Sequence, residues 1–85
     1  MDLRITTARS GEATRVILAG RLAGESTADL DRIVGDAGGE IRLDLGELRG
    51  ADAEGLALLR RLQAKGVQLE RASPYINLVL KLEES

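Results

Sequence analysis

The sequence lacks the two residue types that carry most metal and acid–base chemistry in proteins. Its 85 residues include no cysteine, which excludes disulfide bonds and thiolate metal sites. They also include no histidine, which is the commonest metal ligand and the commonest general base near neutral pH. We therefore expect a protein without catalytic residues, cofactor or metal ion.

Aromatic residues are almost as scarce. There is no tryptophan or phenylalanine, and Tyr75 is the one tyrosine. The hydrophobic share is nevertheless 44%, which is ample for one core in a chain of this length. We expect residues 1–85 to form a single domain whose core consists of leucine, isoleucine, valine and alanine.

Long apolar runs and blocks of like charge are missing too. The longest apolar stretches are about five residues, whereas a helix needs roughly 20 to span a bilayer. Residues 1–4 alternate charged and apolar side chains, unlike the apolar centre of a secretory signal. The 12 basic and 14 acidic side chains are dispersed, with a net charge of −2, which argues against nucleic-acid binding. The expected compartment is the cytoplasm, without direct membrane insertion.

Hydrophobic periodicity predicts the strands. Alternating and continuous apolar patterns indicate four of them, over residues 3–7, 14–22, 41–45 and 67–71. The first two are expected to pair as a hairpin, and a loop is expected over residues 46–52. The chain order β-β-α-β-α-β-α predicts an α/β fold in which right-handed crossovers build one largely parallel sheet.

Capping residues predict three helices. The first is expected to follow Ser26 or Thr27 as its N-cap and to end at Gly38. Asp52 is the expected N-cap of a second helix over residues 53–65. The Ser73-Pro74 pair favours a third helix over residues 75–84, because proline at the first helical position gives up an N–H that has no partner there. Apolar residues also alternate in this tail, so a strand remains the alternative.

The helix over residues 53–65 has two contrasting sides. At 100° per residue, one side gathers the expected core residues Gly55, Leu56, Leu59, Leu62 and Gly66. Another strip carries Glu54, Leu58, Arg61 and Lys65. Two interpretations of this strip stay open: an ordinary solvated helix face, or a docking strip for a partner. The apolar Leu58 at its edge supports the second.

Two segments around this helix resemble the signature of the STAS domain, the family of bacterial anti-sigma factor antagonists and related modules. Residues 43–46 read LDLG, where the family has a strand ending in LDLS. Residues 50–59 read GADAEGLALL, where the family has DS[ST]GL and a leucine-rich helix. The resemblance extends over roughly residues 3–82. It implies a mixed β-sheet with helices packed mainly on one face.

The resemblance also implies a function. In the family, an anti-sigma factor kinase of the GHKL type phosphorylates a hydroxyl in the DS[ST]G motif, and the unphosphorylated antagonist docks on that kinase to regulate transcription. In this chain the two hydroxyl positions are occupied by Ala53 and Glu54, so phosphorylation there is excluded. Glu54 either imitates a phosphate or is simply a good first-turn helix residue.

The chain is also C-terminally short against the family pattern, which continues with a further strand and a final helix. Its last helix carries Tyr75, Leu78 and Leu82 on one apolar stripe and Ile76, Val79 and Leu80 on another. A helix that is apolar nearly all round is buried or has a partner. A homodimer or hetero-contact through this helix is therefore a hypothesis.

The sequence thus predicts a non-catalytic interaction module. The expected partner surface comprises Gly50, Asp52, Ala53, Glu54, Leu58 and Arg61. Two alternatives to an anti-sigma factor partner remain: a non-switching subunit of an ABC-type lipid-transport complex, bound to its ATPase, and a module that senses a nucleotide or another small ligand. Asp44 and Asp52 flank the motif loop. The sequence offers no nucleophile or set of metal ligands beside them, so acid–base catalysis by this pair is not expected.

Overall fold

The computed structural model describes residues 3–84, and for residues 82–84 the backbone only. The elements follow the predicted order: β1 (Leu3–Ser10), β2 (Ala13–Leu22), α1 (Glu25–Ala37), β3 (Glu40–Ala51), α2 (Ala53–Ala64), β4 (Gln68–Glu70) and α3 (Pro74–Glu84). The tail is a helix, as the Ser73-Pro74 start favours. Ser73 Oγ accepts a hydrogen bond from the backbone N–H of Ile76 at 3.1 Å, which caps this helix.

The four strands form one mixed sheet in the order β1-β2-β3-β4. The hairpin prediction is confirmed, because β1 and β2 are antiparallel, with Thr6 opposite Ile17. The pairs β2–β3 and β3–β4 are parallel, and each is connected through a helix. The α/β class and the largely parallel arrangement are therefore confirmed.

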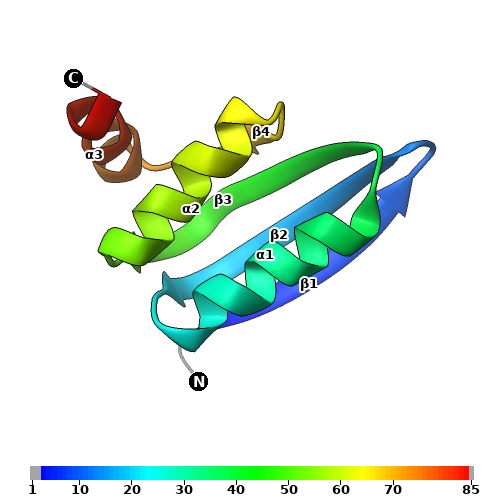
Figure 1. The fold of residues 1–85 in the computed structure, drawn as a ribbon, viewed down its shortest axis with the longest axis horizontal. Coiled ribbons are helices and arrows are strands. Elements are labelled where there is room, and N and C mark those ends of the chain that lie inside the picture. Colours follow the sequence, from blue (N-terminus) through cyan, green and yellow to red (C-terminus); the bar gives the residue numbers. More distant parts are fainter. Residues whose placement is uncertain (1–2, 85) are drawn as a thin grey trace.

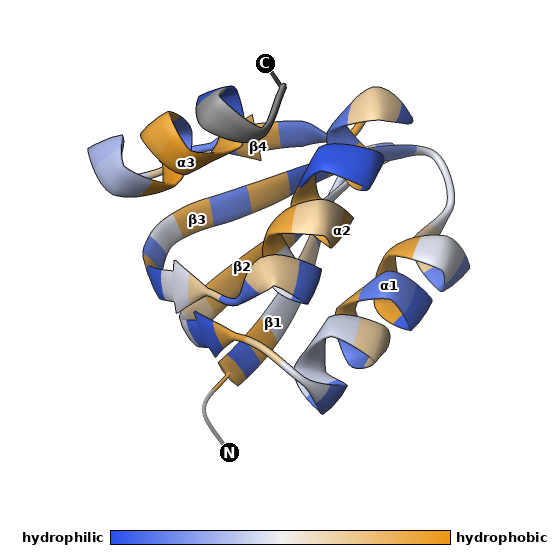
Figure 2. Ribbon diagram, turned by 60° about the vertical axis from the view of Figure 1, so that its left-hand side comes forward, coloured by the Kyte–Doolittle hydropathy of each residue, from blue (hydrophilic) through white to orange (hydrophobic). Residues whose placement is uncertain are grey.

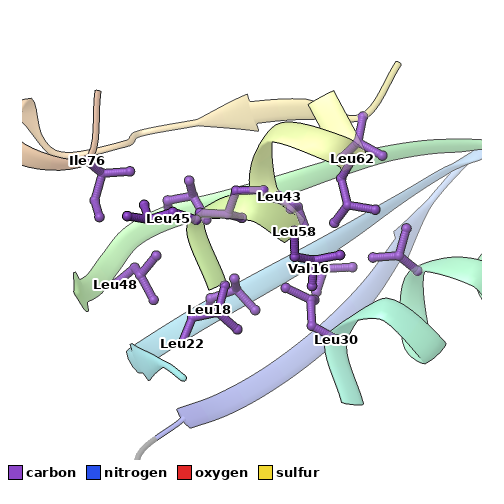
Figure 3. Packing of buried hydrophobic residues seen from close by; sticks show 14 of the residues in the cluster. Val16, Leu18, Leu22, Leu30, Leu43, Leu45, Leu48, Leu58, Leu62 and Ile76 are labelled. Atoms are coloured by element: carbon purple, nitrogen blue, oxygen red, sulfur yellow. The ribbon is translucent and has the colours of Figure 1, made fainter. Parts of the chain in front are cut away.

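The helices lie on one face of this sheet. Figure 1 shows α1 and α2 side by side in front of the strands, and α3 packs next to α2. Side chains from this face build the core, among them Val16, Leu18 and Leu22 of β2, which are fully buried. Figure 3 shows these residues meeting leucines of β3 and α2. No helix in residues 3–84 is long and apolar enough to cross a membrane.

The opposite face of the sheet carries no helix. Arg15 and Ile17 of β2, which alternate with the buried residues, are only partly covered, and Thr6 on β1 is exposed. Figure 2 shows the same alternation as blue and orange bands along the strands. On the described part of this face, only Asp44 is buried. We refer to it as the open sheet face.

Two of the boundaries that differ from the sequence predictions lie at the junction of β2, α1 and α2. The segment expected to be a loop over residues 46–52 continues β3 as far as Ala51. Its backbone pairs with residues 19–22 of β2, and two irregularities in register absorb the extra residues. The first helix begins at Glu25 with Gly24 as its N-cap, so the cap predicted at Ser26 or Thr27 is wrong. The hydroxyl of Ser26 instead bonds to the backbone of Ala23.

The predicted exposure of Leu58 is also wrong. This side chain is 1% exposed and lies in the core. Figure 3 shows it among Val16, Leu30 and Leu43. The reason is the neighbouring helix: α1 packs beside α2 and covers the strip that would otherwise face solvent. Arg61, one turn further along that strip, reaches α1 at its outer rim and pairs with Asp31 at 3.2 Å.

Helix α3 separates its two apolar stripes. Ile76 and Leu80 are buried in the core, whereas Tyr75 and Leu78 are more than half exposed. Leu82, the third member of the exposed stripe, lies outside the described side chains. The hypothesis of a dimer or hetero-contact through α3 therefore concerns Tyr75 and Leu78, and it stays a hypothesis.

Replacing Leu58 with alanine tests its place in the core. We expect Leu58→Ala to lower the free energy of unfolding by about 2–5 kcal/mol, because it leaves a cavity in a packed core. The exposed Leu78 provides a matched control, and Leu78→Ala should change that free energy by no more than about 0.5 kcal/mol. Urea unfolding measures both. Equal, small effects of the two substitutions would place Leu58 on the surface after all.

Candidate functional site

The start of α2 is held by the carboxylate of Asp52. Its Oδ1 accepts a hydrogen bond from the backbone N–H of Gly55 at 2.8 Å, which confirms Asp52 as the N-cap. Its Oδ2 accepts from the N–H of Gly24, at the start of α1, at 3.2 Å. The N–H of Asp52 donates to the carbonyl of Leu22 at 3.0 Å. One residue thus joins the end of β2, the start of α1 and the start of α2.

These contacts favour the ionised form of Asp52. Its pKa lies below the ordinary value of 3.8, chiefly because the Gly55 N–H bonds to the carboxylate. Partial burial opposes this shift, while the Gly24 N–H and the positive charge of Arg21 add to it. Asp52 is therefore a charged anchor at neutral pH, in the place where the helix dipole also favours negative charge.

Gly55 allows α2 to approach the sheet closely. A Cβ atom built on this residue would lie 2.5 Å from the carbonyl oxygen of Leu22 and 3.2 Å from the Cβ of Ala51. The first contact involves backbone, which cannot rotate away. Only glycine therefore fits where the first turn of α2 crosses the ends of β2 and β3.

Ala53 and Glu54 are exposed on the first turn of α2, directly after the cap. Neither side chain offers a hydroxyl, so the exposed first turn presents a methyl group and a carboxylate. The hydroxyl of Ser26 lies near this turn. Ser26 is in the first turn of α1, and the N–H of Gly24 at the start of α1 is bonded to Asp52. That hydroxyl is already engaged on both sides, accepting from the N–H of Ala23 at 3.0 Å and donating to its carbonyl at 2.6 Å.

The structure brings most of the predicted surface together. Gly50 pairs with Arg21 across the strands just before the cap, and Ala53 and Glu54 follow it. Arg61 is exposed two turns along the helix. Leu58 does not belong to this surface because it is buried.

Sequence reasoning missed the residues that are exposed on the outer side of α2, where it had expected Leu58. A shallow depression on the outer side of α2 is lined by Ala57, Arg60, Arg61 and Ala64. Ala57 and Ala64 are exposed and lie on the same helical stripe as Ala53: Ala57 is four residues after Ala53, and Ala64 is seven residues after Ala57. Their signal in the sequence is weak, since small residues on a helix predict no particular face.

Asp44 belongs to a different site. Its carboxylate lies on the open sheet face, where Oδ1 accepts from the N–H of Gly46 at 2.9 Å. Oδ2 pairs with Arg15 at 3.1 Å and with Arg71 at 3.3 Å. Gly46 leaves room for this arrangement, because a Cβ there would lie 2.8 Å from the Arg71 guanidinium.

The geometry gives Asp44 a structural role. Its pKa lies below the ordinary value of 3.8, with the Gly46 hydrogen bond as the largest cause; burial opposes the shift, and Arg15 and Arg71 add to it. Asp44 and Asp52 are eight residues apart along nearly continuous strand, or more than about 20 Å. They cannot act on one substrate atom. Among the described residues, no group of three or more carboxylates is placed to hold a metal ion.

Adding a methyl group at Gly55 tests the close approach of α2. We expect Gly55→Ala to destabilise the protein by roughly 1–3 kcal/mol, because the new Cβ forces the helix away from Leu22. Gly35, in the middle of α1 with open space around its Cβ position, is the control. Gly35→Ala should stabilise by up to about 1 kcal/mol through helix propensity. If both substitutions changed the free energy of unfolding in the same direction, the steric explanation would be contradicted.

The two carboxylates predict how stability depends on acid. Both pKa values are lower in the folded state than the ordinary value of 3.8, so each group stabilises the fold when ionised. That contribution is complete above the unfolded pKa and is lost as the pH falls below 3.8 through the folded value. Urea unfolding at several pH values should therefore show that the free energy of unfolding falls below about pH 4. This fall should be smaller in Asp44→Asn and in Asp52→Asn than in the unaltered protein. If the free energy of unfolding fell equally steeply with pH in both variants and in the unaltered protein, these two carboxylates would be excluded as the source of the fall.

Comparisons with known proteins bear on this arrangement. No protein-family model matches the chain, and no curated protein does. Solved structures do match. One described as "Crystal Structure Analysis of Mglu" has a TM-score of 0.61 and 23% identity over 80% of this chain, and the chain spans only 20% of its length.

Three other structures are similar over most of their own length. The anti-sigma factor antagonist SpoIIAA in its unphosphorylated form has a TM-score of 0.63 and 20% identity, over 93% of this chain and 81% of SpoIIAA. A SpoIIAA-like protein of the DUF3478 family from Shewanella loihica has a TM-score of 0.60 and 15% identity, over 98% and 77%. The STAS domain of an antisigma-factor antagonist from Rhodobacter sphaeroides has a TM-score of 0.54 and 15% identity, over 86% and 94%. The chain therefore has the STAS fold of SpoIIAA and related anti-sigma factor antagonists.

Proposed function

We propose that residues 1–85 form one STAS domain that works as a non-catalytic interaction module of the anti-sigma factor antagonist kind. In this proposal it binds an anti-sigma factor of the GHKL kinase type in a bacterial cytoplasm and so regulates transcription. The docking surface consists of Gly50, Asp52, Ala53, Glu54, Ala57 and Arg61. Binding is not switched by phosphorylation at Ala53 or Glu54.

The observation that carries the proposal is the exposed first turn of α2, fixed in place by Asp52. This carboxylate ties the turn to Gly24 and Gly55. The same turn is free of long side chains at Ala53 and Ala57, which leaves a partner access to the helix. A pre-ordered surface of this kind binds without the entropy cost of ordering a loop. The likeness to SpoIIAA and to the Rhodobacter STAS domain supports the choice of partner class.

The chemistry of Glu54 favours constant rather than switched binding. Its side chain places one negative charge beside the helix N-terminus, where the macrodipole favours it. A phosphate would carry about −1.5 to −2 charges and three acceptor oxygens, so a single carboxylate imitates it poorly. We therefore assign Glu54 to the docking surface as a helix-stabilising residue. Control of such a protein would come from its amount or from its partner.

A bulky charge on the outer side of α2 tests the docking surface. Ala57→Arg should weaken binding to a purified anti-sigma factor kinase by at least about tenfold, because the long side chain blocks the surface. Ala57 is exposed, so the fold should remain intact, as circular dichroism would report. Ala8→Arg, at an exposed position on the open sheet face, is the matched control and should bind normally. Isothermal titration calorimetry measures each affinity.

Three results would count against the proposal. Equal binding by both variants would move the contact away from α2. Failure of the unaltered chain to bind any kinase of this type, together with binding to an ABC-type ATPase, would indicate a subunit of a transport complex instead. A rise in melting temperature with a nucleotide, and no protein partner, would indicate a small-ligand module.

A further inference from the structure

The open sheet face has two ends that differ in charge. At one end every arginine has an acidic partner: Arg15 pairs with Asp44 and with Glu70, at 3.1 and 3.2 Å. Arg42 pairs with Glu40 at 2.9 Å, and Arg71 reaches Asp44. These ion pairs connect β2, β3 and the residues around β4. This end of the face is therefore neutralised by the chain itself.

At the other end the arginines have no such partners. Arg4 of β1, Arg21 of β2 and Arg49 of β3 are exposed, and none of them forms an ion pair with a described carboxylate. They surround a broad, open hollow of about 1300 Å³. Among the described residues that line it, Glu47 is the one carboxylate. We call Arg4, Arg21 and Arg49 the arginine cluster.

Folding gains no ion pair between the arginine cluster and a described carboxylate, although the positive charge of Arg21 helps to keep Asp52 ionised. Like charges gathered on one surface repel each other and oppose folding. Each side chain is exposed, so its apolar stem contributes little to the core. A cluster without an ion pair to a described carboxylate, beside an end of the same face where the arginines are paired, points to a role in binding.

The shape of the hollow favours an extended chain. The small residues Ala19, Gly20 and Gly46 are among those that line it, and three adjacent strands contribute its arginines. Strands lie about 4.8 Å apart, so the cluster spans roughly 10 Å, more than one phosphate group can bridge. Alternate residues of an extended peptide lie about 6.5 Å apart on one side, which suits carboxylates reaching neighbouring guanidiniums.

A membrane surface fits the hollow less well. Binding to a bilayer combines basic residues with apolar side chains that enter the lipid. The two leucines that line the hollow, Leu3 and Leu48, are 8% and 4% exposed and face the core. Among the described residues that line the hollow, no large apolar side chain is exposed for insertion.

We propose that the arginine cluster is a binding site for an acidic, extended peptide segment of a partner protein. The segment lies across the hollow with two or more carboxylates paired to Arg4, Arg21 and Arg49. Gly50 of β3, which belongs to the docking surface, is the strand partner of Arg21, so one partner can cover both surfaces. The charge and shape of the hollow carry this inference, which does not depend on which partner binds at α2.

The test uses a free peptide, so its outcome is separate from any kinase binding. A fluorescein-labelled octaglutamate is titrated with the full chain, and anisotropy is measured at roughly 20 mM and 200 mM salt, because screening weakens ion pairs between exposed groups. An octaglutamine peptide reports binding that does not depend on charge. We expect the acidic peptide to bind at low salt and to weaken at high salt, and octaglutamine not to bind.

A matched pair of variants locates the site. The double variant Arg4→Glu, Arg49→Glu should weaken octaglutamate binding by at least about tenfold. The double variant Arg9→Glu, Arg32→Glu makes the same change in net charge at exposed arginines away from the hollow, and it should lose no more than about twofold. Circular dichroism and thermal melts should match the unaltered protein for the first variant, since Arg4 and Arg49 make no ion pair with a described carboxylate that folding would lose.

The proposal fails under three outcomes. Equal losses in the two double variants would mean that net charge, and not the hollow, attracts the peptide. Absence of octaglutamate binding at low salt would exclude an acidic peptide. Binding to vesicles of phosphatidylcholine and phosphatidylserine that is lost in Arg4→Glu, Arg49→Glu, with no binding of the peptide, would assign the cluster to a lipid surface instead.

Discussion

The contact between the first turn of α2 and the end of β2 is the constraint on which the rest of the structure depends. Gly55 lies so close to the carbonyl of Leu22 that no side chain fits between them. Asp52 fixes the same junction by bonding to Gly55 and Gly24 while its own N–H bonds to Leu22. The helix is then pressed onto the sheet along its length, which places Leu59 and Leu62 in the core. A change at this junction would displace α2 and, with it, the surface that we assign to partner binding.

The position of α2 also divides the molecule into two unlike faces. On one side, three helices cover the sheet and all the apolar packing is concentrated there. On the other side, the sheet faces solvent and is organised by charge. Asp44 is the centre of this organisation, since it is buried and holds Arg15 and Arg71. A buried carboxylate requires such partners, because an unpaired charge out of water is costly. Arg4, Arg21 and Arg49 form no ion pair with the described members of this network and are exposed.

The site at α2 combines a conventional scaffold with altered chemistry. The Asp52 cap and the close contact of Gly55 hold the exposed first turn in one place. Ala53 and Glu54 nevertheless supply a methyl group and a carboxylate at that turn. A permanent charge cannot be added or removed by an enzyme. In our proposal the docking surface therefore stays in one state, and regulation acts through some other part of the system.

The sequence by itself determined the features that depend on neighbours in the chain. The order of the elements, the Asp52 cap, the Ser73-Pro74 helix start and the lack of a hydroxyl at residues 53 and 54 were all readable, because capping and periodicity act within a few residues. The resemblance over residues 43–59 indicated the fold as well. Tertiary structure decided what lies far apart in the chain. Leu58 is buried because α1 covers it, β3 reaches Ala51 because β2 offers backbone partners, and the arginine cluster exists because three strands align. Such contacts join residues some 15 to 45 positions apart along the chain, and no local pattern of side chains specifies which of them will meet.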